Sequence, residues 1–235
     1  MFAIYKREMR SYFTGVIGYV FLVLFLALGG GIFCLTTMFS MTSNPSQFFT
    51  YMLMFFAIIL PLLTMKSFSE ERKMKTEQLV LTAPISLPAM VFGKFLAPYV
   101  IYAGCTVLTS LYFLLLVPYA ELKFAVLLGE VVAMLLIGGV FIAIGLFVSS
   151  LTENQLSAAI GTIAIILAFF GIGLVGSLLP SNYWLRFVFD ALSIFTRFET
   201  FINGYFDLAS LLYYISVGAV FFWLTIRVYD RRRFG

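Results

Sequence analysis

The charged segment Lys66–Glu77 holds the residue types that could do chemistry in this chain. It contains seven charged side chains, in a sequence that has only 15 basic and 11 acidic residues in all. Its adjacent carboxylates, Glu70 and Glu71, could hold Mg²⁺ for a membrane-embedded prenyl or phosphoryl transferase. Four basic side chains lie among them and would compete with the metal ion. We therefore expect no metal site, and a transferase is the third of the three hypotheses that the sequence allows.

Missing residue types exclude most other reactions. The sequence has no histidine, so it lacks Ser-His and Cys-His nucleophile pairs and the HExxH zinc motif. A phosphate-binding loop is also missing, because Gly93-Lys94 is followed by Phe95, and Pro88 stands where the loop needs its first glycine. We expect neither an enzyme nor a cofactor in this chain. If ATP and Mg²⁺ are used, a partner subunit binds them.

The composition is that of an integral membrane protein, with 62% hydrophobic and 11% charged residues. Its apolar runs are too long for barrel strands, so the predicted fold class is all-α. A helix needs roughly 20 apolar residues to cross a bilayer, and six segments qualify within a single transmembrane domain, residues 1–235. They are about Val16–Phe39, Phe48–Met65, Val91–Val117, Phe124–Val148, Leu156–Leu179 and Leu208–Val228.

Basic residues cluster before the first span, between the second and third spans, and after the last span. These three places hold twelve of the 15 basic residues, and the positive-inside rule puts that side in the cytoplasm. We expect a multi-pass protein of the bacterial plasma (inner) membrane with both termini cytoplasmic. Topology and contact with anionic lipid account for the net charge of +4, so no nucleic-acid partner is expected.

Two segments outside the spans also show helical spacing of apolar residues. In residues 1–14 the apolar side chains are interleaved with Lys6, Arg7 and Arg10, which predicts an amphipathic interface helix whose basic side chains contact the membrane surface. In residues 180–207 aromatic side chains recur at the same spacing. This pattern predicts short external helices, either interfacial or re-entrant.

Glu130 is the one ionisable side chain clearly inside a predicted span. Charges within a membrane are costly and usually face a bundle interior or a water-filled path. Glu130 is therefore a candidate residue of a substrate path. Because it lies about two turns from the outer end of its span, reaching out to the interface or carrying a proton are the alternatives.

The charged segment itself predicts a short cytoplasmic helix. A turn at Pro84 and a second helix would follow, and the whole connection covers residues 66–90. Glu71 and Lys75 form an i, i+4 pair in the favourable order. A solvated loop that only fixes topology is the alternative. The three glutamates argue against that alternative, since topology requires only basic residues.

The run Phe68–Ser86, followed by Gly93-Lys94, resembles the first cytoplasmic loop of type-2 ABC transporter (ABC-2) permeases. The likeness is closest to the branch of the gliding-motility-associated permease, whose loop has a similar Phe-x-Glu-Glu-Arg, Thr-x-Glu-Leu and Thr-x-Pro-x-Ser series. The C-terminal part is also similar, so the likeness covers nearly the whole chain. The matching C-terminal residues are Thr196–Gly204, Asp207, Tyr213-Tyr214 and Arg231–Arg233.

The resemblance implies a function and partners. In that family the first cytoplasmic loop forms a coupling helix that seats in a groove of the ATP-binding subunit, and by position this role falls on Glu70, Glu71, Arg72, Thr76 and Glu77. Six spans make half a transporter, which implies a second permease copy or a paralogue and two ATP-binding subunits. An extracytoplasmic accessory protein would be a further partner.

The leading hypothesis is therefore the permease subunit of an ATP-driven ABC-2 exporter. The runner-up is a membrane scaffold or assembly factor that recruits a cytoplasmic partner and transports nothing. Stimulation of ATP hydrolysis by a substrate distinguishes the two, because a scaffold should show none.

Overall fold

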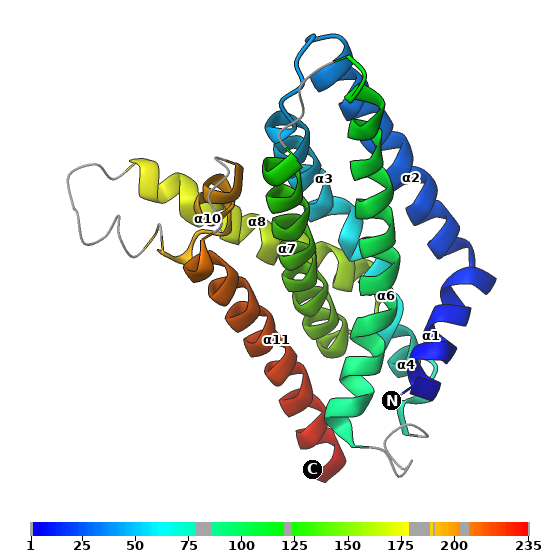
Figure 1. The fold of residues 1–235 in the computed structure, drawn as a ribbon. Coiled ribbons are helices and arrows are strands. Elements are labelled where there is room, and N and C mark those ends of the chain that lie inside the picture. Colours follow the sequence, from blue (N-terminus) through cyan, green and yellow to red (C-terminus); the bar gives the residue numbers. More distant parts are fainter. Residues whose placement is uncertain are drawn as a thin grey trace.

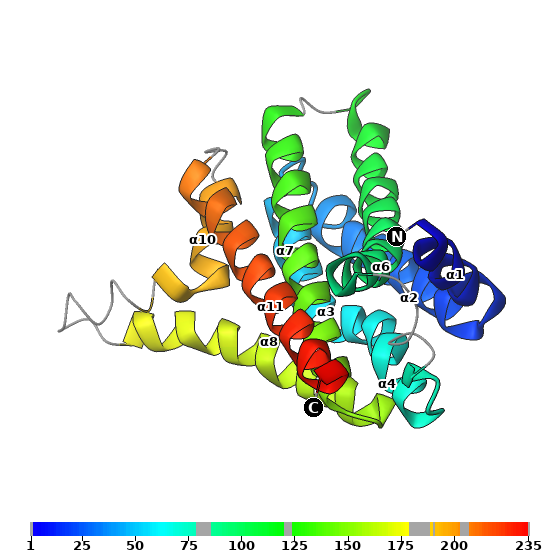
Figure 2. The same cartoon turned by 90° about the horizontal axis from the view of Figure 1, so that it is seen from below.

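The computed structural model of the protein describes residues 2–78, 86–119, 124–178, 189, 191–202 and 207–234. Every regular element in these ranges is a helix, which confirms the predicted all-α class. The helices form one bundle, with α8 extending away from the others (Figure 1, Figure 2).

Among the described residues, six helical segments are long and apolar enough to cross a membrane, and each coincides with a predicted span. Several consist of two consecutive elements, because a helix changes its winding or breaks near one end. The six are Val16–Met38 (α2, Val16–Phe33, and η1, Cys34–Met38), Ser46–Lys73 (α3, Ser46–Thr64, and α4, Lys66–Lys73), Leu87–Leu116 (α6, Leu87–Ser110, and η2, Leu111–Leu116), Phe124–Leu151 (α7), Gln155–Gly176 (within α8, Gln155–Leu178) and Leu208–Arg233 (within α11, Leu208–Phe234).

Helix α7 lies at the centre of the bundle, where it contacts α3, α4, α6, α8 and α11 (Figure 1). Its sequence is apolar on all sides, which is typical of a helix surrounded by other helices. The position of α7 means that elements from both ends of the molecule are fixed against one helix.

Glycines on α7 allow two neighbouring helices to approach closely. A Cβ atom at Gly138 would overlap the ring of Tyr102 on α6, and one at Gly145 would overlap the side chain of Thr64 on α3. The hydroxyl of Tyr102 also donates to the carbonyl of Met134, at 2.6 Å. Small residues at such contacts are how membrane helices gain packing area where no hydrophobic driving force exists.

The N-terminal segment forms the predicted helix, α1 (Phe2–Thr14). Ile4 and Tyr12 are buried against the bundle, whereas Phe2 is exposed. Helix α1 packs on α2 and α6, at the end of the molecule that also carries α4 and the C-terminus of α11 (Figure 1). We call this the basic end. That α1 lies on a membrane surface stays a prediction.

At the opposite end, the short helix α10 (Ile194–Ile202) packs on α7 and α8. It falls within the segment 180–207 for which we expected external helices. Residues 180–188, 190 and 203–206 of that segment lie outside the described residues.

The close approach at Gly138 gives a test of the packing. In Gly138→Ala the new methyl group meets the buried ring of Tyr102, so we expect the free energy of unfolding to fall by about 1–3 kcal/mol. The matched control is Gly129→Ala on the same helix, where an added Cβ meets nothing within 4 Å. Thermal unfolding in detergent micelles, followed by circular dichroism, measures both. Equal midpoints for the two variants would contradict this packing.

Candidate functional site

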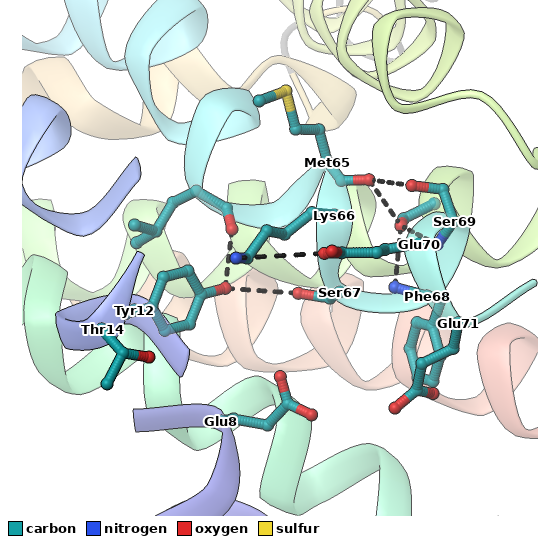
Figure 3. A network of polar contacts seen from close by, with 12 residues as sticks. Glu8, Tyr12, Thr14, Met65, Lys66, Ser67, Phe68, Ser69, Glu70 and Glu71 are labelled. Atoms are coloured by element: carbon teal, nitrogen blue, oxygen red, sulfur yellow. Dashed lines mark hydrogen bonds and ion pairs between the residues drawn. The ribbon is translucent and has the colours of Figure 1, made fainter. Parts of the chain in front are cut away.

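The predicted coupling segment forms helix α4, which continues from α3 after a break at Met65. Ser149 of α7 fills that break, and Figure 3 shows Met65, Phe68 and Ser69, whose backbone groups it contacts. Its hydroxyl oxygen accepts from the backbone N–H groups of Phe68 and Ser69, each at 3.1 Å, and donates to the carbonyl of Met65 at 3.0 Å. Backbone groups at a helix start have no intrahelical partner, so a side chain from α7 supplies the cap.

Tyr12 of α1 attaches to the same junction (Figure 3). Its buried hydroxyl donates to the carbonyl of Leu63 at 2.7 Å and lies 3.3 Å from the hydroxyl of Ser67. Burial raises the pKa of the Tyr12 phenol, so the group stays protonated and remains a donor. The N-terminal helix is thereby held on α3 and α4 by directional contacts in addition to apolar packing.

Lys94 of α6 lies at the centre of the site with a side chain that is 0% exposed. Its ammonium group lies 3.1 Å from a carboxylate oxygen of Glu8 and 3.0 Å from one of Glu71. It also donates to the carbonyl of Ser67 and lies 4.8 Å from the centre of the Phe68 ring. An ammonium group has three protons to donate, and these three acceptors match that number.

Arg7 completes the group, with its guanidinium 2.8 Å from Glu8 and 2.5 Å from Glu71. We call Arg7, Glu8, Glu71 and Lys94 the charge cluster. It contains two cations and two carboxylates, so it is neutral as a unit. A buried charge is tolerated when it is paired and hydrogen-bonded in this way.

The charge cluster also shifts the pKa values of Glu8 and Arg7. Burial alone would raise the pKa of the Glu8 carboxyl, but Lys94 and Arg7 outweigh it and hold that pKa below its ordinary value. Burial alone would lower the pKa of Arg7, whereas the bonds to Glu8 and Glu71 raise it. Because the folded pKa of Glu8 is depressed, its contribution to stability is present above the ordinary carboxyl pKa and is lost as the pH falls through the folded value.

Two further ion pairs hold the rest of the segment against the bundle. Arg72 lies 3.0 Å from Glu153 and donates to the carbonyl of Leu151 at 2.7 Å. Arg232 of α11 lies 2.9 Å from Glu77 and donates to the carbonyl of Ser150 at 2.6 Å. Both arginines therefore bind backbone at the end of α7 as well as a carboxylate.

Residues 73–76, the last residue of α4 and the turn that follows it, project away from these contacts. Lys73, Met74, Lys75 and Thr76 are all exposed, and Met74 is 68% exposed. Lys75 has a φ of 57°, so the chain leaves the helix in a left-handed conformation. Because the helix ends at Lys73, the expected Glu71–Lys75 pairing gives way to the contacts of Glu71 with Lys94 and Arg7. We call residues 73–76 the exposed turn.

The predicted coupling residues thus fall into two groups. Glu71, Arg72 and Glu77 are engaged within the chain. Thr76 is exposed, and Glu70 is 42% exposed beside Lys66, at 3.9 Å. Of the residues predicted to contact membrane, Lys6 and Arg10 are exposed, and Arg7 is exposed but belongs to the charge cluster.

Sequence reasoning missed several partners in this site. Lys94 enters the sequence-based reasoning through the pair Gly93-Lys94 and as a topology signal, with no predicted counter-charge, although a lone cation inside an apolar helix is itself a sign of a nearby counter-charge. Nothing in the local sequence indicates the partners that other helices supply. The missed residues are Glu8, Tyr12, Lys94, Ser149, Glu153 and Arg232.

Glu130 lies on α7 about 28 Å from Ser149 along the helix, at the opposite end of the molecule. Its residue surface is 0% exposed, and neither carboxylate oxygen has a hydrogen-bond partner among the described residues. The hydroxyl of Ser46 lies near it but donates to Asn44 at 2.8 Å. The structure therefore places Glu130 in the bundle interior, and its role in a substrate path stays a prediction.

The described residues contain no group of three or more His, Cys, Asp or Glu side chains that could hold a metal ion. The charge cluster cannot serve as one, because Lys94 already occupies the space between its two carboxylates. The chemistry of the charge cluster is that of ion pairing within the chain.

Comparison with known proteins gives the family. No curated protein matches the sequence. The model of the family described as ABC-2 family transporter protein matches residues 2–232, which is nearly the whole chain. Six apolar helices of spanning length agree with that match. The chain therefore belongs to the ABC-2 family of transporter proteins and has the architecture of a membrane transporter permease subunit.

Proposed function

We propose that this protein couples ATP hydrolysis by a separate ATP-binding subunit to the export of a substrate. The observation that carries the coupling role is the exposed turn at the end of a helix that is otherwise held by contacts with α1, α6 and α7. Met74 offers an apolar side chain to a partner, and Lys73 and Lys75 offer positive charge. Neither lysine has an ion-pair partner in the part of the chain that the structure describes. A partner groove with an apolar floor and acidic rim would fit this turn.

The contacts of α4 suit the transfer of force. A soluble subunit that moves during its ATP cycle can move the spans only through an element that does not yield. Helix α4 meets this need, because it is fixed to α1 and α6 through the charge cluster, to α7 through Ser149 and Arg72, and to α11 through the Glu77–Arg232 pair that follows it. Displacement of the exposed turn would therefore act on several spans at once.

We propose the following assembly around this chain. Two permease copies, or this chain and a paralogue, would complete a transport path. One ATP-binding subunit would dock at the exposed turn of each permease chain, and these subunits would hold ATP and Mg²⁺. The basic end would face the cytoplasm of a bacterial cell, with Lys6 and Arg10 on the membrane surface, and an extracytoplasmic accessory protein would bind the opposite end. The similarity of the segment around α4 to the gliding-motility-associated permease branch favours this arrangement.

Purification of the affinity-tagged full chain from its native membranes tests the proposal. We expect it to retain an ATP-binding subunit, and the purified complex to hydrolyse ATP in reconstituted vesicles. A complex without ATPase activity, or a chain that purifies alone under mild detergent, would contradict the proposal. ATP hydrolysis that no candidate substrate stimulates would instead favour the scaffold.

The exposed turn gives a specific prediction. The double reversal Lys73→Glu and Lys75→Glu should weaken retention of the ATP-binding subunit by about tenfold, which is about 1.4 kcal/mol. Thermal stability of the isolated chain should not change, since no ion pair within it is lost. The charge-matched control Lys6→Glu and Arg10→Glu alters α1 at the same end and should leave retention intact. Equal retention in both double variants would exclude the turn as the docking site.

The charge cluster gives a second prediction. In Lys94→Met the two carboxylates lose their buried cation, so we expect the free energy of unfolding to fall by about 3–5 kcal/mol. Adding Glu8→Gln should recover much of that loss, because Arg7 and Glu71 then remain as a neutral pair. Thermal midpoints in detergent measure both variants. A Lys94→Met protein as stable as the natural one, or no recovery in the double variant, would show that the cluster contributes little.

Glu130 is proposed to lie on the substrate path, uncovered when the bundle opens. In this structure its carboxyl has no described partner, so the isosteric Glu130→Gln should be as stable as the natural chain or more so. If Glu130 lies on the substrate path, Glu130→Gln should also reduce the stimulation of ATP hydrolysis by substrate. Thermal unfolding and ATPase assays on the reconstituted complex measure the two effects. A large loss of stability in Glu130→Gln would reveal a partner that requires the negative charge.

A further inference from the structure

A groove of about 490 Å³ lies on the flank of the bundle, between α6, α7 and α11. In Figure 1 helices α6 and α11 converge toward the end that carries the C-terminus and diverge toward the other end, with α7 between them. Aromatic rings close the groove where the helices converge. The ring centroids of Phe92 and Phe95 on α6 lie 6.2 and 6.4 Å from that of Phe222 on α11.

The lining of the groove is almost entirely apolar. Two tyrosines contribute its hydroxyl groups, and that of Tyr214 already donates to the carbonyl of Ile194 at 2.9 Å. The ring of Tyr99 stacks on Phe95 with centroids 5.4 Å apart. A lining of this kind selects an apolar ligand, because a polar one would lose its hydrogen bonds with water and gain few in return.

Small residues make the groove deep, and the packing of the bundle does not require all of them. A Cβ atom at Gly218 on α11 would meet only a methyl group of Val140, at 3.9 Å, which is ordinary contact. Alanine is a better helix former than glycine, so a glycine here lowers helix propensity without serving a close helix contact. The missing side chain leaves space in the groove.

The position of the groove limits what can fill it. Its lining lies along stretches of three segments of membrane-spanning length, from Phe92 to Tyr99, Leu135 to Ala143 and Tyr214 to Phe222. The groove is therefore about 12 Å long at 1.5 Å per residue. Between its headgroup layers a bilayer contains hydrocarbon and almost no water, so water-soluble ligands are excluded from this groove.

A helix of a second protein fits the groove less closely than lipid chains do. With a diameter of about 10 Å, a helical segment of the same length occupies roughly 900 Å³, so it could enter the groove of about 490 Å³ only in part. Flexible hydrocarbon chains can fill the space and contact the aromatic rings. We propose that this groove is a lipid-binding site that holds the acyl chains of a membrane phospholipid, a role independent of whether the protein transports a substrate.

Photo-crosslinking of the full chain tests this proposal. The protein is reconstituted in vesicles of phosphatidylethanolamine and phosphatidylglycerol, with a small fraction of phosphatidylethanolamine that carries a diazirine in the middle of one acyl chain. After irradiation, mass spectrometry of peptides locates the lipid adducts. We expect adducts on the groove residues of α6 and α11 to be several-fold more frequent than on equally lipid-accessible residues of other spans, such as Val23 and Ile160.

A matched pair of glycine variants sharpens the test. Gly218→Leu places a side chain in the groove and should reduce the adducts there at least threefold. Gly104→Leu on α6 adds the same side chain where a Cβ meets nothing within 4 Å, outside the groove lining, and should leave them unchanged.

Three results would overturn the proposal: adducts spread evenly over all lipid-facing helices, Gly218→Leu labelled like the natural chain, or groove residues without lipid adducts, which is the result expected if a second protein covers the groove. If Gly218→Leu does not fold, the distribution of adducts on the natural chain still decides the question.

Discussion

A buried ammonium ion requires counter-charges, and this requirement at Lys94 determines the arrangement of the basic end. The ion lies in an otherwise apolar helix with no exposed surface, so its neutralisation must come from other segments. Glu8 of α1 and Glu71 of α4 supply it. Removing either helix would take away one of the two carboxylates that contact Lys94. Removing both would leave the ammonium group buried without a counter-charge, at a cost far above that of losing a surface ion pair. Helices α1, α4 and α6 are therefore expected to move as one unit.

This constraint explains why the charged segment carries both signs. Its carboxylates are counter-charges for cations elsewhere in the chain: Glu71 for Lys94 and Arg7, and Glu77 for Arg232. Arg72 pairs with Glu153 beyond the end of α7. The lysines of the exposed turn have no ion pair among the described residues. One short segment thus has an inward face that fixes its position and an exposed outward face, which is the proposed docking surface.

Hydropathy and basic-residue counts were enough to predict the spans and the helical class, because both depend on properties of contiguous segments. The same reasoning found a helix at α4 and singled out Glu130. It could not find the partners of Glu71, since the cation at the favourable i, i+4 spacing, Lys75, lies beyond the end of the helix, whereas the actual partners lie on α6 and α1. Likewise Gly138 was recognisable as a small residue, but its contact with Tyr102 depends on how α6 and α7 pack. Pairings between distant segments are not encoded in local periodicity.

The two ends of α7 differ in how their polar groups are satisfied, and this difference bears on motion. At the basic end Ser149 makes three hydrogen bonds to the α3–α4 junction, and the carbonyls of Ser150 and Leu151 accept from arginines. At the other end the buried carboxyl of Glu130 has no partner among the described residues. Opening the basic end would break many directional contacts, whereas opening the other end would relieve a desolvated carboxyl by admitting water. A displacement applied at the exposed turn would therefore be carried along α7 with little deformation at the basic end, and the opposite end is where the bundle would yield first.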